Sequence, residues 1–466
     1  MKRFVFVFAA GLLGLGGAAF AQTPRVDEPE AATAALRAQG EQFEEEIVTV
    51  SDGVFVAVGY SPANVGLIVG ENGAVVIDTG MSVDDGRRIA AEFRKLTDKP
   101  VRAIVFTHSH GDHTGGAAAF LELADEKPQV WAHENFGSEA RPLLAGGVSF
   151  QRVRGARQAG FMLPPEDRIN NGVAPARYPK RGGNAFEAGR EVKPSQFLAE
   201  ESRTVEVGGV TIELVAAPGE TNDELFVWHG ASRTLFAGDN FYRSFPNLYA
   251  IRGTPNRSVR LWADSLDKMV DRDAAALVGG HTDPVLGEEQ VREVLTDYRD
   301  AVQYIHDETV AGMNRGLTPD ELAATVRLPE RLANKEYLRP FYGHPEWGVR
   351  SVFAGYLGWF DGNPTNLFRL PPKEEAERFA KLAGGAENLR SAAREALEGG
   401  DGADAQWAAQ LADRLLALDP EDQAAKNLKA DALTQLARRS VTATARNYYL
   451  TVAQGLRGET DDAGAE

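Results

Sequence analysis

The chain has 466 residues, 43% of them hydrophobic and 25% charged, which is long enough for more than one domain around a large buried core. Its formal net charge of −17 argues against nucleic acid or an anionic membrane surface as the main partner. The absence of cysteine excludes disulfides, zinc–thiolate sites and thiol nucleophiles, so a transition metal would have to be held by histidines and carboxylates.

The N-terminus predicts an export signal. Lys2 and Arg3 supply positive charge, residues 4–18 form an apolar stretch, and Ala-Phe-Ala at 19–21 is a small-x-small cleavage site. We expect residues 1–21 to be removed and the protein to be periplasmic or secreted. A membrane anchor is the alternative, but the stretch is short and glycine-rich for a span, and no second run of spanning length follows. No stable membrane insertion is expected.

A layered α/β domain is predicted over residues 44–315, after a polar leader at 22–43. Strand patterns alternate with helical ones, and the Asn72-Gly73 turn separates two of the strands. Residues 82–96 are expected to form a helix with Ser82 as its N-cap, and residues 258–270 a second helix. The predicted strands lie at 47–60, 65–78, 101–107, 129–132, 204–207, 210–216, 225–228, 234–237 and 274–278. Residues 144–198 show no clear periodicity, and we expect them to pack over the mouth of a site.

From residue 288 onward the pattern is almost entirely helical. One long helix is expected over 288–312, and Thr318-Pro319-Asp320-Glu321 has the pattern of a capped helix start. Residues 405–418 and 423–436 resemble a tetratricopeptide-like helical pair, with a plain helical bundle as the alternative. We therefore predict an all-α domain over 316–456 and a disordered tail over 457–466.

Four ligand-type side chains occur in one run of six residues. His108, His110, Asp112 and His113 follow directly after the strand predicted at 101–107. Imidazole and carboxylate groups suit zinc above other divalent cations. Four such groups on one short loop fit two neighbouring ions better than one tetrahedral ion. The pattern therefore predicts a two-metal hydrolytic site, whereas a lone histidine would more often be a packed or surface residue.

The H-x-H-x-D-H run resembles the signature of the metallo-β-lactamase superfamily. Asp78, at the end of a strand, matches the buried aspartate of that family, and Pro218-Gly219-Glu220 stands where many members have Pro-Gly-His. Asp239 matches the carboxylate that bridges the metals, and His281 the last ligand. The resemblance implies the αββα sandwich of this superfamily.

The carboxylate at position 220 is characteristic of the alkylsulfatase branch, which the chain resembles over residues 45–455. Asn247-Leu248-Tyr249 and Arg252-Gly253 are similar to a segment of that branch. Tyr342-Gly343 and residues 356–364 resemble its dimerisation region, which implies a homodimer. Two departures are that Asp239 replaces a typical Glu and that Thr282-Asp283 follows His281 where the branch tends to have His-Trp. The chain also stops without the sterol-carrier-like domain of typical members, which bears on substrate length.

The resemblance implies two Zn²⁺ per chain and a small sulfate ester as substrate. One zinc would take His108, His110 and Glu220, and the other Asp112, His113 and His281, with Asp239 and a water or hydroxide bridging them. The sulfate would be bound by Asn247, Arg252, Arg257 and Tyr342. Asp112 and Glu224 are the candidate catalytic residues, Glu224 as a proton donor or as a rival to Glu220 for the metal. Without the resemblance, two arginines five residues apart would be read as surface charges.

Two other functions remain open at the sequence level. One is a different hydrolase on the same fold, such as a lactonase, a β-lactamase or a phosphodiesterase. The other is a helical-repeat binding protein with a non-catalytic α/β scaffold, although the intact ligand set argues against it.

Overall fold

The computed structural model describes residues 28–177 and 191–459. The predicted export signal lies outside these residues, as does the predicted tail from residue 460 onward. The predicted start of that tail at residue 457 is wrong, because Arg457 is the last residue of a helix and Gly458 caps it. The polar leader contains one helix, α1 (Pro29–Gln39), followed by a short 3₁₀ turn at Gly40–Phe43. No helix within the described ranges combines the length and apolar character that crossing a bilayer requires.

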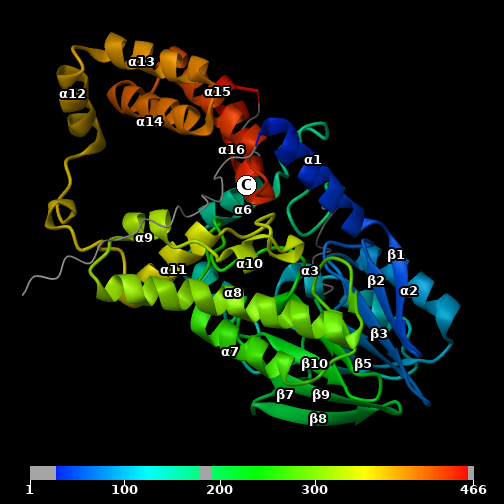
Figure 1. Cartoon of the computed structure of the whole chain (residues 1–466). Helices are drawn as coiled ribbons and strands as arrows, with labels where there is room; N and C mark the ends of the chain where they lie inside the picture. Colours follow the sequence, from blue (N-terminus) through cyan, green and yellow to red (C-terminus); the bar gives the residue numbers. More distant parts are fainter. Residues whose placement is uncertain (1–27, 178–190, 460–466) are drawn as a thin grey trace, which may run out of the picture.

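Two β-sheets form the centre of the N-terminal part (Figure 1). In the first, strands that follow one another in the chain are neighbours throughout. It comprises β1 (Glu46–Ser51), β2 (Val54–Val58), β3 (Val65–Val69), β4 (Ala74–Ile77), β5 (Val101–Val105), β6 (Gln129–His133) and β7 (Gln196–Leu198). The second runs in the order β13 (Val285–Leu286), β12 (Ala276–Val278), β11 (Thr234–Phe236), β10 (Leu225–His229), β9 (Val210–Ala216) and β8 (Ser202–Val207).

The core between the sheets consists of β-branched and aromatic side chains. Val56, Ile77 and Val105 from the first sheet meet Leu214 and Phe236 from the second in one buried cluster. Such side chains suit a pleated surface packed on a neighbour, and their burial removes apolar area from water. The turn predicted at Asn72-Gly73 joins β3 and β4, whose antiparallel register pairs Val69 with Ala74.

Helices cover the outer face of each sheet. On the first sheet, Ile89 and Phe93 of α2 (Val83–Leu96) and Phe120 of α4 (Ala117–Leu121) complete a second buried cluster. On the second sheet lie α7 (Val259–Val270) and α8 (Glu288–Asn314). Ser82 caps α2 as predicted, and Ser258 caps α7 in the same way, each accepting a backbone N–H. The α–β–β–α layering predicted from the sequence is confirmed.

The largest hydrophobic cluster continues beyond α8 into the helical region. Phe353 of α11 (Pro345–Leu357) and Leu322 of α9 (Pro319–Thr325) are buried in the same cluster as Trp262 of α7. The capping box predicted at Thr318 and Glu321 is present, with both reciprocal hydrogen bonds formed. Helix α10 (Glu330–Ala333) adds Leu332 to this core.

Five further helices form the C-terminal lobe. They are α12 (Pro372–Leu382), α13 (Ala386–Gly399), α14 (Gly402–Leu418), α15 (Gln423–Arg439) and α16 (Ala443–Arg457). Each of α13, α14 and α15 packs against the helix that follows it. The last helix turns back toward the α/β part, where it packs against α6 (Phe150–Ala159), as Figure 1 shows near the C-terminus.

Helix α6 lies in the segment 144–198, whose sequence shows no clear periodicity. Half of its ten residues, FQRVRGARQA, are Gln or Arg, and Gln158 is its buried residue. Packing against α16 therefore stabilises this helix where an apolar stripe of its own is lacking. A shorter helix, α5 (Ala140–Ala145), precedes it.

Candidate metal centre

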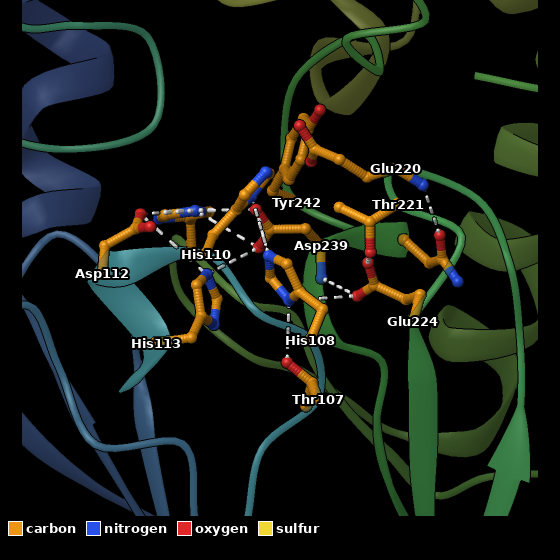
Figure 2. Close-up of polar contacts among 12 residues, drawn as sticks. Thr107, His108, His110, Asp112, His113, Glu220, Thr221, Glu224, Asp239 and Tyr242 are labelled. Carbon is orange, nitrogen blue, oxygen red and sulfur yellow. Dashed lines mark hydrogen bonds and ion pairs between the residues drawn. The ribbon is translucent and has the colours of Figure 1, made fainter. Parts of the chain in front are cut away.

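The metal-ligand candidates gather where strands of the two sheets end. β4 and β5 are parallel neighbours, and so are β11 and β12. His108 follows β5, Asp239 lies in the 3₁₀ turn after β11 (Gly238–Asn240), and His281 follows β12. Asp112 and His113 lie on the short helix α3 (Gly111–Thr114). Because parallel strands end at the same edge, residues far apart in the sequence meet in one small volume (Figure 2).

All seven predicted ligands belong to clusters whose ligand atoms lie within 4.8 Å of one another. The three clusters share members, and Asp239 occurs in two of them. They are His108–His113–Asp239, Asp112–His113–His281 and His110–Glu220–Asp239. Asp239 links two of the clusters and His113 links the third to them, so the candidate ligands form one continuous group.

Three of these residues carry a buried polar atom that has no hydrogen-bond partner among the described residues. The atoms are His113 Nε2, Glu220 Oε2 and Asp239 Oδ1. His113 Nε2 and Asp239 Oδ1 lie 3.2 Å apart, yet they do not have the geometry of a hydrogen bond. Buried polar atoms are rarely left without partners, and lone pairs that converge on one point fit a cation. The residues present therefore fit bound divalent metal.

Asp78 orients His113 from outside the cluster. Its Oδ2 lies 2.8 Å from His113 Nδ1, and it also accepts hydrogen bonds from the backbone N–H and hydroxyl of Thr107, both at 2.8 Å. A carboxylate acceptor places the ring proton on Nδ1 and leaves the Nε2 lone pair facing the cluster. Asp78 has a φ of 56°, a backbone conformation that costs free energy for most residues.

His281 is oriented in the same way by a backbone carbonyl. Its Nδ1 lies 2.7 Å from the carbonyl oxygen of Pro62, while its Nε2 lies 3.2 Å from Asp239 Oδ1. His108 has the Thr107 hydroxyl 3.1 Å from its Nδ1, and its Nε2 faces His110 Nδ1 at 2.9 Å. Each of these histidines thus presents one nitrogen to the cluster and binds protein with the other.

Glycines allow the close approach of the loops. A Cβ on Gly115 would lie 1.9 Å from the Met81 carbonyl oxygen, so only glycine lets α3 sit this close to the loop after β4. A Cβ on Gly280 would lie 2.0 Å from Asp239 Oδ1 and would block the cluster itself.

The two glutamates near residue 220 occupy different places. Glu220 is 1% exposed and belongs to a ligand cluster. Glu224 is completely buried on the far side of His108, where its Oε1 accepts the backbone N–H of Asp239 at 2.8 Å. Burial, together with the charges of Asp239 and Glu220, raises the pKa of Glu224 well above its usual range. The geometry brings Glu220, and not Glu224, to the ligand atoms (Figure 2).

The two predicted sulfate-binding arginines lie beside the His110–Glu220 side of the cluster. Arg257 Nη1 donates to Glu220 Oε1 at 2.5 Å and to the carbonyl oxygen of Asn247 at 2.7 Å. Arg252 Nη2 is 3.3 Å from His110 Nε2. Arg257 is only 4% exposed, so it is a buried cation rather than a solubilising surface charge.

Asn247 and Tyr342 lie near the two arginines, since the Asn247 carbonyl oxygen accepts from Arg257 and the charges of Arg252 and Arg257 act on the Tyr342 hydroxyl. Asn247 is buried, and its Oδ1 has no hydrogen-bond partner in the described part of the chain. The ring centroid of Tyr342 lies 5.5 Å from that of Tyr242. The Tyr242 hydroxyl in turn accepts the backbone N–H of Asn247 at 2.8 Å. Aromatic packing therefore positions the polar groups of this pocket.

Two residues of the site carried no sequence signal. Glu139, just before α5, contacts His110, Arg252 and Arg257. Burial raises its pKa, but the charges of His110, Arg257 and Arg252 outweigh burial and hold the pKa well below its usual range. Tyr242 is completely buried between His281 and Tyr342. Neither residue belongs to a motif, so only the folded chain brings them to the site.

Comparisons with known proteins agree with this geometry. Residues 58–281 match the family model of the metallo-β-lactamase superfamily, and residues 318–459 match that of alkyl sulfatase dimerisation. The chain is 36% identical over 409 residues to a linear primary-alkylsulfatase of Pseudomonas sp. (strain ATCC 19151), covering 85% of this chain and 74% of that protein. It is 34% identical to an (R)-specific secondary-alkylsulfatase of Pseudomonas sp., covering 86% of this chain but 60% of that protein.

A solved alkylsulfatase structure is also similar to this chain. The stereoselective inverting sec-alkylsulfatase Pisa1 from Pseudomonas sp. superposes with a TM-score of 0.81 at 29% identity, covering 94% of this chain and 71% of that chain. Both sequence and structure thus agree along nearly the whole described chain. The protein belongs to the alkylsulfatase branch of the metallo-β-lactamase superfamily, a family of sulfuric ester hydrolases with a helical dimerisation domain.

Proposed function

We propose that the protein is a zinc-dependent alkylsulfatase that hydrolyses small alkyl sulfate esters to an alcohol and sulfate. The observation that carries the proposal is the placement of Arg252 and Arg257 beside the ligands His110 and Glu220. A hydrolytic metal centre and a site for an anionic head group are therefore contiguous.

Zinc is the proposed metal because the ligand set is imidazole and carboxylate without thiolate. In the proposal, His108, His110 and Glu220 hold one ion and Asp112, His113 and His281 the other, with Asp239 between them. When bound, the two ions would lower the pKa of water enough to supply a nucleophile near neutral pH.

The pocket residues act on the sulfate group. Arg252 and Arg257 carry forked N–H donors that match the oxygens of a sulfate ester, and Asn247 and Tyr342 line the same pocket. Local cations are needed here because the net charge of −17 repels anions at long range. Glu224 touches the centre through the backbone of Asp239 and through His108, so its proposed part is to hold these two ligands in place.

Sulfate release from a panel of alkyl sulfates, before and after chelation, tests the proposal. Chain lengths from short to long are included, with a lactone, a β-lactam and a phosphodiester as comparison substrates. We expect release from at least one alkyl sulfate, its loss on chelation and its return with zinc. Protein that holds two zinc ions yet releases sulfate from no ester would reject the sulfatase function.

A homodimer and an exported location complete the proposal. Large apolar side chains are exposed between α11 and α12, with Trp359 78% and Phe368 95% exposed, which supports a surface that a second copy covers. A mass of one chain, measured by light scattering, would reject the dimer.

The positive and apolar residues at the N-terminus support export of the protein. Fractionation of cells and the N-terminal sequence of the recovered protein would test this location.

A further inference from the structure

Glu139 is a nearly buried carboxylate that lies between the metal ligands and the anion pocket. Its side chain is 11% exposed, and its Oε1 lies 3.1 Å from both His110 Nε2 and Arg252 Nη2. Its Oε2 lies 3.8 Å from Arg257 Nη2. One side chain therefore contacts a candidate metal ligand and both arginines of the pocket.

The contact with His110 determines which ring nitrogen faces the metal cluster. His110 Nδ1 lies 2.9 Å from His108 Nε2, on the cluster side of the ring. Its other nitrogen, Nε2, lies 3.1 Å from Glu139 Oε1 on the opposite side. Arg252 Nη2 is 3.3 Å from the same nitrogen, but a guanidinium only donates, so Glu139 is the acceptor available to the ring N–H. A neutral imidazole carries one N–H, so a carboxylate acceptor at Nε2 keeps the proton there and leaves Nδ1 free to bind a cation.

The same arrangement occurs twice more around the centre. His113 has the Asp78 carboxylate behind its Nδ1, and His281 has the Pro62 carbonyl behind its Nδ1. In both cases the acceptor lies on the side of the ring away from the cluster. Glu139 completes this pattern for His110, although it comes from a different element of the fold.

The contacts with the arginines act on the pocket. Two buried or half-buried guanidinium groups repel each other, and a carboxylate between them reduces that repulsion. Because Glu139 contacts both arginines, it also limits the orientations that their donors adopt before an ester binds. Glu139 is the one described residue whose carboxylate touches both arginines as well as a metal ligand.

We infer that Glu139 is a positioning residue that couples the His110 side of the metal centre to the Arg252–Arg257 pocket. The metal half of this inference does not depend on the substrate. The pocket half rests on the proposed alkylsulfatase function. The two halves therefore need separate measurements.

The variants E139Q and E139D test the inference, with E134Q as the matched control. Glu134 lies five residues earlier and is exposed, and its backbone N–H donates to the Leu198 carbonyl oxygen, away from the arginines. Zinc affinity is measured on the full chain by competition with a chromophoric chelator, and bound zinc is counted by mass spectrometry. Outer partners of metal-bound histidines typically contribute about 10–100-fold in affinity. We expect E139Q to bind one of the two zinc ions with an affinity lower by about tenfold or more. E139D should recover part of that affinity, and the zinc affinity of E134Q should match that of the unmodified protein.

A folded E139Q protein with unchanged zinc affinity would overturn the metal half, and circular dichroism and thermal unfolding verify the fold.

For the pocket half, the dissociation constant of inorganic sulfate is measured on the zinc-loaded proteins. Removing a negative charge leaves the pocket more cationic, so E139Q should bind sulfate at least as tightly while its kcat for an alkyl sulfate falls about tenfold or more. Weaker sulfate binding, or an unchanged kcat, would overturn this half. A lack of turnover in the unmodified protein would instead reject the proposed function and leave the zinc result standing.

Discussion

The Thr444 hydroxyl of α16 donates a hydrogen bond of 2.8 Å to the carbonyl oxygen of Tyr342, 102 residues earlier in the chain. A second contact of α16 supports Arg252 through Gln158. The Asn447 side chain donates to the carbonyl oxygen of Gln158, and the Gln158 side chain accepts the backbone N–H of Arg252 at 3.0 Å. The last helix of the C-terminal lobe therefore supports two residues of the candidate anion pocket.

Replacing Thr444 with valine should weaken ester binding without affecting the metals. The change removes a buried hydrogen bond, which typically costs about 1 kcal/mol of stability, and frees the segment that carries Tyr342. We expect KM for an alkyl sulfate to rise several-fold while zinc content stays at the unmodified level. The matched control is T451V, because Thr451 is equally buried on α16 but bonds only to its own helix, at the Asn447 carbonyl. Equal KM values for the two variants would contradict this role of α16.

The two pocket arginines should differ in their effects. Arg252 is half-buried and ends beside His110, whereas Arg257 is buried and pairs with Glu220. R252A should therefore raise KM for the ester and leave zinc affinity near that of the unmodified protein. R257A removes the cation paired with a buried carboxylate, so it should also lower thermal stability and change zinc affinity. Steady-state kinetics with a zinc competition assay separate the two outcomes, and identical behaviour of both variants would speak against the asymmetry.

Asp78→Asn should weaken zinc binding while preserving the fold. Asparagine tolerates the positive φ of 56° at this position and keeps the size of the side chain, but it loses the charge that faces His113 Nδ1. We expect a loss of about 10–100-fold in the affinity for one zinc ion. The amide can still accept from Thr107, so the far-ultraviolet circular dichroism spectrum should match that of the unmodified protein. An unchanged zinc affinity would show that the outer acceptor on His113 has no effect on the metal.

Chelation should lower the thermal stability of the protein. A metal that binds only the folded state stabilises it by about 2.7 kcal/mol when its free concentration is 100 times its dissociation constant. The effect should be large because the buried atoms His113 Nε2, Glu220 Oε2 and Asp239 Oδ1 have no other partner among the described residues. Calorimetry with and without a chelator, followed by readdition of zinc, measures the shift. The double variant H110A/H281A should unfold at the same temperature in both conditions.

Without metal, Glu220 should make stability depend on pH. Burial raises the pKa of Glu220 to about 7, with Arg257 opposing the rise, from an ordinary value of 4.5. Between these two values the folded chain keeps a proton that the unfolded chain has released. The contribution of this group is therefore complete below pH 4.5 and is lost as pH rises through 7.

The variant E220Q, which does not titrate, provides the reference for that measurement. The stability of the metal-free protein relative to metal-free E220Q should fall between pH 5 and pH 8, with a slope of at most about 1.4 kcal/mol per pH unit. Urea unfolding at several pH values gives the two curves. A constant difference would contradict a raised pKa at Glu220. At pH 8 with saturating zinc, the unmodified protein should be more stable to unfolding than E220Q, since Glu220 is a proposed ligand. Without zinc we expect the opposite order of stability.

Sequence alone determined the parts of this protein that depend on local patterns. Strand alternation, the Ser82 cap and the Thr318 capping box were all readable, because each depends on neighbours within a few residues. The spacing of the His108–His113 run predicted a metal site for the same reason. Resemblance then added Glu220, Asp239 and His281, which the folded chain places in the same clusters.

Tertiary structure decided what local patterns cannot encode. Nothing in the sequence near Glu139 marks it, because its partners His110, Arg252 and Arg257 lie 29, 113 and 118 residues away and meet it only through the fold. Helix α6 has no clear apolar stripe in its sequence. It is stabilised by packing against α16, a contact that its local sequence does not encode. The difference between Glu220 and Glu224 was likewise geometric. Both are buried carboxylates, and only the direction of each side chain separates a candidate metal ligand from a partner of the Asp239 backbone.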